Sequence, residues 1–209
     1  MSGWTAERAK QSQILGSFRF CTVLNGLDAE HTFRRPEAVQ AEERTVLNVT
    51  AHFSPEKDHP KGGWHLIQLA KRMPDVTFLV AGRADPVTEL PENLHLLGEI
   101  HDQQKLAELY RKAKVTLLVS RRETFSMPCA ESLCCGTPVV GFRAGSPEQI
   151  ALPDYSEFVP FGDLDMLENA LYGWLEKGID RQLLAEQAEQ TYSAEKMVRD
   201  FLELYGGKL

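Results

Sequence analysis

The stretch VTLLVSRRETFSMPCAESLCCGTPVVGF, from Val115 to Phe142, joins two apolar runs through one short helical segment. VTLLVS and PVVGF are rich in Val and Leu without polar alternation, which is typical of strands buried on both faces of a parallel sheet. Pro128 suits the first turn of a helix, and Gly136-Thr137-Pro138 predicts its end, because Pro cannot continue a helix. This strand–helix–strand pattern favours an α/β fold.

The same alternation continues on both sides of this stretch. Short apolar runs are each followed by a segment with helical spacing of its apolar residues, which predicts a parallel sheet of about six strands with helices on both faces. VTLLVS and PVVGF should be central and buried. Ser146 and Pro147 predict another helix start. The expected segments are a helix over 1–17, a strand over 18–28, an irregular linker over 29–44, strands near 45–53, 76–82 and 93–100, helices near 62–73 and 102–113, and a helical tail over 163–209.

Composition and charge exclude several classes of protein. The chain has 209 residues, is 43% hydrophobic and carries a formal charge of -7, so it is an ordinary globular chain without the basic surface of a nucleic-acid binder. The four cysteines lack metal-ligand spacing and a disulfide framework, which indicates reduced thiols and a cytoplasmic protein. No apolar run approaches the roughly 18 residues of a membrane span, and peripheral association with the inner face of a membrane stays open.

Polar motifs follow the ends of the predicted strands, where ligands of parallel sheets bind. The loop SPEKDHPKGG after the first of these strands carries Lys57 and Lys61 before Gly62 and Gly63 open a helix. Glycines let backbone N–H groups approach an anion, and a lysine supplies a point charge. The loop therefore suits a diphosphate, although a solvated loop with surface lysines fits this segment equally well.

The turn ETFSMPCAE places Glu123 at the mouth of the sheet and Glu131 on the following helix. Backbone amides in the first turn of a helix have no intrahelical partner, so those of the turn can face a ligand. Each carboxylate can accept two hydroxyl donors. The arrangement suits a ligand with a diphosphate in the middle and a sugar at each end, and the alternative is a capping carboxylate beside a surface glutamate.

These residues resemble those of a known family. The spacing E-x7-E, the run ESLCCGTPVVGFRAGSPEQI, the amino-terminal WTAERAKQSQILGS with VLNGLD, and the closing YSAEKMVRDFLELY are similar to the carboxyl-terminal half of retaining glycosyltransferases with two Rossmann-like domains. These are the GT-B, family 4-like "glycosyl transferases group 1" enzymes of polysaccharide biosynthesis. The resemblance implies a crossover and linker over 1–44, a Rossmann-like donor-binding domain over 45–190, and a helix over 191–209 that returns to an amino-terminal domain outside this chain.

The resemblance also implies a role for each matching residue. Glu123 would hold hydroxyls of the transferred sugar, Glu131 would hold the ribose, and Lys61 would neutralise the diphosphate as the bond breaks. His52 stands where the family usually has an arginine, and Thr124 and Ser126 replace two glycines of its turn. The implied donor-binding residues, beside the catalytic pair Glu123 and Lys61, are Glu131, Thr124, Phe125, Ser126 and Met127, His52, and, at the base, Glu99 and Ile100.

The first hypothesis is that the chain is the donor-binding half of a hexosyltransferase that uses a UDP- or GDP-sugar without a metal or cofactor. The acceptor, a glycan or lipid-linked molecule, would bind the amino-terminal domain, so this chain alone should transfer nothing. A second hypothesis is a non-catalytic nucleotide-sugar-binding module that regulates or scaffolds a partner, favoured by His52 and the replaced glycines. A nucleotide-sugar epimerase of the same architecture ranks last, because that group lacks E-x7-E followed by Pro-Val-Val.

Overall fold

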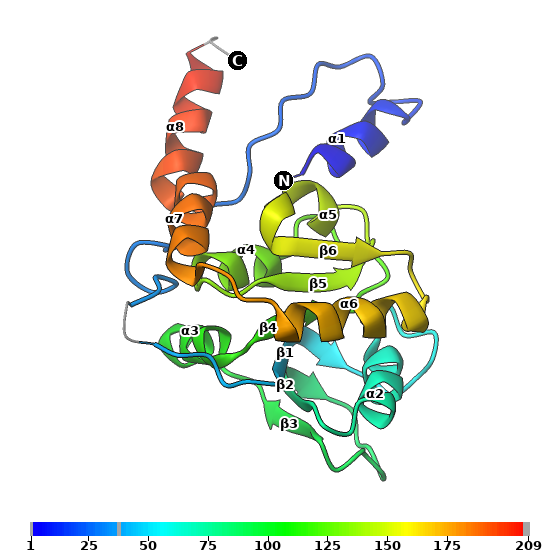
Figure 1. Cartoon of the computed structure of the whole chain (residues 1–209). Coiled ribbons are helices and arrows are strands. Elements are labelled where there is room, and N and C mark those ends of the chain that lie inside the picture. Colours follow the sequence, from blue (N-terminus) through cyan, green and yellow to red (C-terminus); the bar gives the residue numbers. More distant parts are fainter. Residues whose placement is uncertain (1, 37–38, 207–209) are drawn as a thin grey trace.

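The computed structural model describes residues 2–36 and 39–206. Within these ranges the chain forms one six-stranded sheet in the order β3-β2-β1-β4-β5-β6, and every neighbouring pair is parallel (Figure 1). The fold is therefore the predicted α/β Rossmann-like parallel sheet. The strands are β1 (Thr45–Phe53), β2 (Thr77–Ala84), β3 (Leu94–Gly98), β4 (Val115–Leu118), β5 (Val139–Phe142) and β6 (Ser156–Val159).

Helices cover both faces of the sheet, as predicted. One hydrophobic core lies under α2 and α6, and a second lies under α3, α4 and α7. The amino-terminal α1 and the carboxyl-terminal α8 extend beyond this layered body on the side of α7 and α5 (Figure 1). The helices are α1 (Gly3–Lys10), α2 (Gly63–Arg72), α3 (Gln103–Lys112), α4 (Met127–Cys134), α5 (Pro147–Ile150), α6 (Leu164–Glu176), α7 (Arg181–Tyr192) and α8 (Ala194–Tyr205), with a 3-10 turn η1 (Pro153–Tyr155).

The two predicted central strands are confirmed. β4 lies between β1 and β5, β5 lies between β4 and β6, and every residue of both strands is buried. From β1 the chain runs outward through β2 and β3 and then returns to β4 on the other side of β1. Strand order therefore reverses between β1 and β4, and parallel sheets of this kind bind their ligands at the carboxyl ends of the strands on either side of such a point.

The amino-terminal segment differs from the prediction. Residues 18–28 form no strand of the sheet, and only Leu27 makes an isolated bridge, to Ser193. The expected strand over 18–28 is therefore wrong. The sixth strand is instead β6, SEFV, which pairs with β5 at the sheet edge. The predicted helix over 1–17 is shorter, since α1 ends at Lys10 and turns follow.

The described residues of the predicted linker, 29–36 and 39–44, are irregular, as expected, yet they include a buried arginine. Arg35 is 5% exposed and donates hydrogen bonds to the carbonyl oxygens of Arg111 and Cys135, at the ends of α3 and α4. Arg181, at the start of α7, donates to the carbonyl oxygens of Ala113 and Lys114. Cations at helix carboxyl ends complement the helix dipole, so these arginines fasten the linker and α7 to the body.

The four cysteines divide into one exposed and three buried thiols. Cys129 and Cys134 lie on α4 and Cys135 directly follows it, all in the core, and burial raises the pKa of each of the three thiols. Cys21 is exposed, in the segment between α1 and Leu27.

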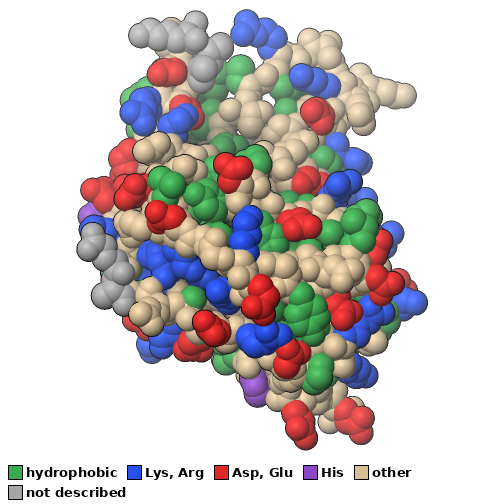
Figure 2. All heavy atoms as spheres, in the orientation of Figure 1, with side chains coloured by type: hydrophobic (Ala, Val, Ile, Leu, Met, Phe, Trp, Pro, Cys, Tyr) green, Lys and Arg blue, Asp and Glu red, His purple; other side chains and the backbone are tan. Residues whose placement is uncertain are grey.

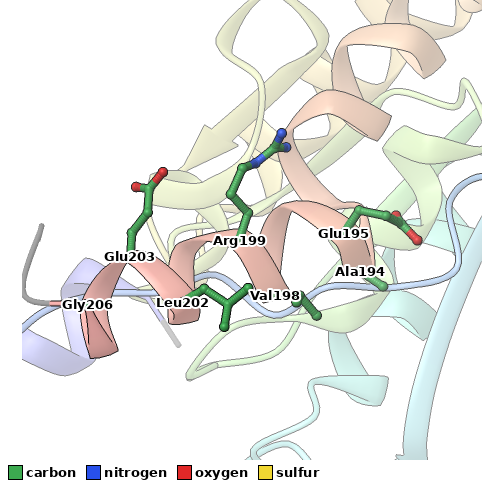
Figure 3. Close-up of a pocket in the computed structure, with 7 residues that line it drawn as sticks. All are labelled: Ala194, Glu195, Val198, Arg199, Leu202, Glu203 and Gly206. Atoms are coloured by element: carbon green, nitrogen blue, oxygen red, sulfur yellow. The ribbon is translucent and has the colours of Figure 1, made fainter.

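The surface carries charges of both signs. Figure 2 shows acidic and basic side chains interspersed over the visible face, without one continuous basic stripe. A hollow of about 520 Å³ runs along α8, where Val198 and Leu202 point to one side of the helix (Figure 3). Leu202 is 66% exposed. That α8 packs on a domain outside this chain stays a prediction, and residues 207–209 of the predicted closing segment lie outside the described residues.

Candidate functional site

A hollow of about 320 Å³ lies at the carboxyl ends of β1 and β4, where strand order reverses. Six of the residues predicted to form the catalytic and donor-binding site line it together, although they come from two loops far apart in the sequence. Polar residues that the sequence did not single out, Asn25, Asn48 and Ser120, also line it. The predicted residues in the hollow are Lys61, Glu123, Thr124, Phe125, Ser126 and Met127.

An ion pair connects the two predicted catalytic residues. Lys61 Nζ lies 2.7 Å from Glu123 Oε1, and the two side chains are 31% and 21% exposed. The structure therefore brings together in one cleft the two residues that the resemblance assigns to one donor site. Lys57 does not compete for this place: its ammonium lies over the ring of Trp64, 5.3 Å from the centroid, and it does not line the hollow.

Backbone geometry fixes both ends of this ion pair. Gly62 is the residue before α2 and is left-handed, with φ of 72°, and a Cβ atom there would stand 2.1 Å from the carbonyl oxygen of Val119. Only glycine allows this close approach. On the other side, the Glu123 N–H donates to the carbonyl oxygen of Ala144, 3.0 Å away, which ties the turn to the end of β5.

The amino terminus of α4 faces the hollow. Ser126 precedes the helix with φ of 76°, a left-handed conformation that is rare outside glycine, and Met127 and Pro128 of the first turn line the cavity. Phe125 is 4% exposed and belongs to the core while lining the hollow. The positive end of a helix dipole beside an ammonium makes this side of the cavity suited to an anion.

The amino-terminal segment closes one side of the same hollow. The hydroxyls of Ser2 and Thr5 donate to the carbonyl oxygen of Thr124, at 2.8 and 3.2 Å. The Asn25 amide donates to the sulfur of Met127 at 4.0 Å, and Asn25 lines the cavity. Contacts between residues about a hundred positions apart in the chain cannot be inferred from sequence spacing.

Glu131 lies on α4 outside the lining of the hollow. Its carboxylate accepts a hydrogen bond of 2.9 Å from the Tyr110 hydroxyl, a residue that is 0% exposed. Burial raises the pKa of Glu131, while the Tyr110 hydrogen bond acts in the opposite direction. The carboxylate is thus neither a simple helix cap nor a fully exposed surface group. Its predicted contact with a ribose stays a prediction.

A second, smaller hollow of about 170 Å³ adjoins the first, and the two share Val49, Thr50 and Ala51 at the end of β1. Glu99 and Ile100, predicted near a nucleotide base, both line it. Arg83 and His101 line it too, and the sequence did not single them out.

His52, predicted among the donor-binding residues, lines neither hollow. The two nitrogens of its ring form hydrogen bonds with the side chains of Asp85 and Arg83, at the end of β2. Because its two ring nitrogens face these partners, the side chain is turned toward β2 and not toward Lys61, and this placement differs from the expected direct contact.

The arrangement can hold an elongated ligand with an anionic centre. The ammonium of Lys61 and the first turn of α4 meet negative charge, Glu123 can accept hydroxyl donors at one end, and the second hollow extends the cavity at the other. Among residues 2–36 and 39–206, no three His, Cys, Asp or Glu side chains cluster as metal ligands would. In the same ranges, no helix is both long and apolar enough to cross a bilayer.

Comparison with known proteins identifies the family. The model of the family described as "Glycosyl transferases group 1" matches residues 31–191. The chain belongs to this family. The resemblance seen in the sequence is thereby confirmed, and Lys61, Glu123 and the turn before α4 all lie inside the matched region of this group 1 glycosyltransferase chain.

Individual relatives agree with this assignment. The chain is 31% identical over 188 residues to a phosphatidyl-myo-inositol mannosyltransferase of Mycolicibacterium smegmatis, an alignment that covers 85% of this chain and 47% of that protein. It is 33% identical over 158 residues to a D-inositol 3-phosphate glycosyltransferase of Xylanimonas cellulosilytica, covering 65% of this chain and 38% of that one. The group 1 glycosyltransferase chain thus spans about half or less of the length of these curated relatives.

A solved structure shows the same fold. Sucrose-phosphate synthase from Thermosynechococcus elongatus superposes with a TM-score of 0.78 at 21% identity, covering 99% of this chain and 57% of that one. At this identity the likeness establishes the Rossmann-like fold and leaves the chemistry to be argued from the residues of the site.

Proposed function

We propose that the chain is the donor-binding half of a retaining hexosyltransferase, which binds a UDP- or GDP-sugar and passes the sugar to a glycan or lipid-linked acceptor. One observation carries the proposal. A lysine, a carboxylate and a helix amino terminus meet in one hollow at the switch point of the sheet, and a second hollow adjoins it and shares three of its lining residues. A nucleotide sugar has the matching order of parts: sugar, diphosphate and nucleoside.

In this proposal each part of the donor meets a different group. The sugar hydroxyls donate to Glu123, the diphosphate lies between Lys61 and the first turn of α4, and the base enters the second hollow beside Glu99 and Ile100. Glu131 accepts the ribose hydroxyls. Tyr110 keeps that carboxylate oriented in the unliganded chain through its hydrogen bond of 2.9 Å.

The proposed chemistry is charge stabilisation at the leaving group. When the bond between the anomeric carbon and the diphosphate breaks, its electron pair stays with the diphosphate. An ammonium and a helix dipole fixed beside that oxygen stabilise the transition state more than the ground state. Lys61 and α4 supply both, so the proposed mechanism needs no metal ion.

The acceptor and the surroundings follow from the family and the relatives. The curated Mycolicibacterium relative is named for transfer to a phosphatidyl-inositol, which supports a lipid-linked or glycan acceptor. Since the chain spans about half of such proteins, we infer that acceptor binding depends on residues outside it. We also infer a cytoplasmic protein that works at the inner face of the membrane.

A non-catalytic nucleotide-sugar-binding module remains a second candidate because of His52. Its imidazole hydrogen-bonds Asp85 and lines neither hollow, so it adds no charge beside Lys61. A sugar-transfer assay on a protein that joins this chain to an amino-terminal acceptor domain separates the two: turnover supports the transferase, and donor binding without turnover supports the module.

Titration calorimetry with UDP, GDP and their sugars tests the proposal on the chain itself. We expect one nucleotide series to bind, and Lys61→Met to weaken it by about 1–3 kcal/mol, the value of a charge-assisted hydrogen bond. Lys57→Met is the matched control, since this lysine of the same loop lies over Trp64 outside the hollow. Absence of binding by both series, or equal losses in both variants, would contradict the proposal.

A further inference from the structure

The second hollow is lined by an arginine, Arg83, whose guanidinium is held at its edge by other side chains. This hollow lies at the carboxyl ends of β1 and β2 and is lined mostly by apolar groups. Arg83 is the only Lys or Arg among the described residues that line it. This residue is exposed at the end of β2, where its register partner across the sheet is His52.

His52 holds Arg83 through a chain of hydrogen bonds. The distance from Arg83 Nη2 to His52 Nδ1 is 3.1 Å, and His52 Nε2 lies 2.8 Å from Asp85 Oδ1. A guanidinium can only donate, so Nδ1 accepts, and the ring hydrogen is on Nε2, where it is donated to Asp85. This tautomer satisfies both contacts, and the orientation of the ring is set on both sides.

Asp85 anchors one end of this series of hydrogen bonds. Its backbone N–H donates to the carbonyl oxygen of Phe53 at 2.9 Å. Hydrogen bonds from Ser54 and His52 hold the pKa of the Asp85 carboxyl below its usual value, so it is ionised at neutral pH. The result is a line from Asp85 through His52 to Arg83, in which a carboxylate at one end positions a cation at the other.

The charges around the second hollow suit an uncharged, flat group. Glu99 lines the hollow together with Arg83, so the site is not strongly positive and does not favour a phosphate. The adjoining hollow, with Lys61 and the amino terminus of α4, already provides for the anionic part of the ligand. A planar guanidinium stacks on a nucleobase or donates to its carbonyl oxygens.

We propose that Arg83 contacts the base of the bound nucleotide and that His52 is its positioning residue, not a ligand of the diphosphate. This inference rests on the proposed function and specifies how the same site holds its base. It gives His52 a role that agrees with its place outside both hollows.

The base contact is tested by comparing a ligand with a base and one without. Binding of the nucleotide that the chain prefers, UDP or GDP, is measured by calorimetry, and inorganic pyrophosphate is measured by its displacement of that nucleotide. We expect Arg83→Met to weaken nucleotide binding by roughly 5- to 150-fold, the range for a hydrogen bond from a charged group, and to leave pyrophosphate binding unchanged. Arg83 is exposed, and thermal unfolding verifies that the variant folds.

Arg143→Met is the matched control. Arg143 is an exposed arginine directly after β5, at the same edge of the sheet and outside the lining of both hollows. This substitution removes the same charge as Arg83→Met, so it should change the affinity for either ligand by no more than about twofold. Unchanged nucleotide affinity in Arg83→Met, or equal weakening of nucleotide and pyrophosphate, would overturn the proposal. Failure of the unaltered chain to bind any nucleotide would instead refute the proposed function.

The positioning role has its own readout. His52→Ala removes the acceptor for Arg83 and should weaken nucleotide binding, whereas His52→Asn places an oxygen near the position of Nδ1 and should restore most of the affinity. In the Arg83→Met background, His52→Ala should have no further effect. An equal loss in both backgrounds would show that His52 acts without Arg83 and would overturn this part.

Discussion

Replacing Glu123 by glutamine should affect two related ligands in opposite directions. In the unliganded chain the Glu123 carboxylate forms an ion pair with the Lys61 ammonium at 2.7 Å, and the two side chains are 21% and 31% exposed, respectively. Water reaches both groups, so the pair contributes about 0.2–1 kcal/mol, as other partly exposed pairs do. A diphosphate that binds Lys61 must compete with this pair. We therefore expect Glu123→Gln to tighten binding of the bare nucleotide diphosphate by up to about fivefold.

The nucleotide sugar should respond in the other direction. It loses a carboxylate that accepts its hydroxyl hydrogen bonds, which costs about 1–3 kcal/mol and exceeds the gain at Lys61. Titration calorimetry of both ligands at low and high salt measures this, and the gain for the bare nucleotide should shrink as salt screens the pair. If Glu123→Gln weakens both ligands equally, Glu123 maintains the shape of the hollow and does not hold the sugar, and the reasoning is refuted.

Three further substitutions test the site from its local geometry. Glu131→Gln should raise the Tm at neutral pH and weaken nucleotide binding. Burial raises the pKa of the Glu131 carboxyl, so the gain in Tm should vanish as the pH falls through that pKa. A Tm difference that does not change with pH would contradict this expectation. Gly62→Ala should lower the free energy of unfolding, measured in urea, by about 2–4 kcal/mol, because φ at this position is 72° and the added Cβ would lie 2.1 Å from a carbonyl oxygen. The control is Gly173→Ala on α6, where no atom lies within 4 Å of the added Cβ, and it should be neutral or stabilising. Ser126→Gly should stabilise the chain by about 0.5–1 kcal/mol, because the left-handed conformation at φ of 76° strains serine; lower stability would show that its side chain matters more than its backbone.

Much of the fold was predictable because its central strands are buried on both faces. Continuous apolar runs identified β1, β4 and β5, and the rule that ligands bind at strand ends brought Lys61 and Glu123 to one cleft. The signal failed at β6. β6 is a four-residue edge strand with three positions that are not buried, so its sequence carries little pattern.

The unpredicted parts of the site depend on contacts between distant elements. Arg83 lies at the end of β2, and only the register of β1 against β2 places it beside His52. Tyr110 belongs to the core, yet its hydroxyl also reaches Glu131 on a neighbouring helix. Such pairings require the packed structure, because sequence spacing carries no information about two elements that meet side by side.

Because only one of the four cysteines is exposed, the folded chain has a single thiol that a reagent can reach. Cys21 is exposed, whereas the three thiols on and beside α4 are buried and hold their protons more tightly than usual. A maleimide dye should therefore attach at Cys21 alone in the native state and at all four positions after denaturation. Because Cys21 lies four positions before Asn25, which lines the hollow, a dye at this position would report optically on ligand entry without any engineered residue.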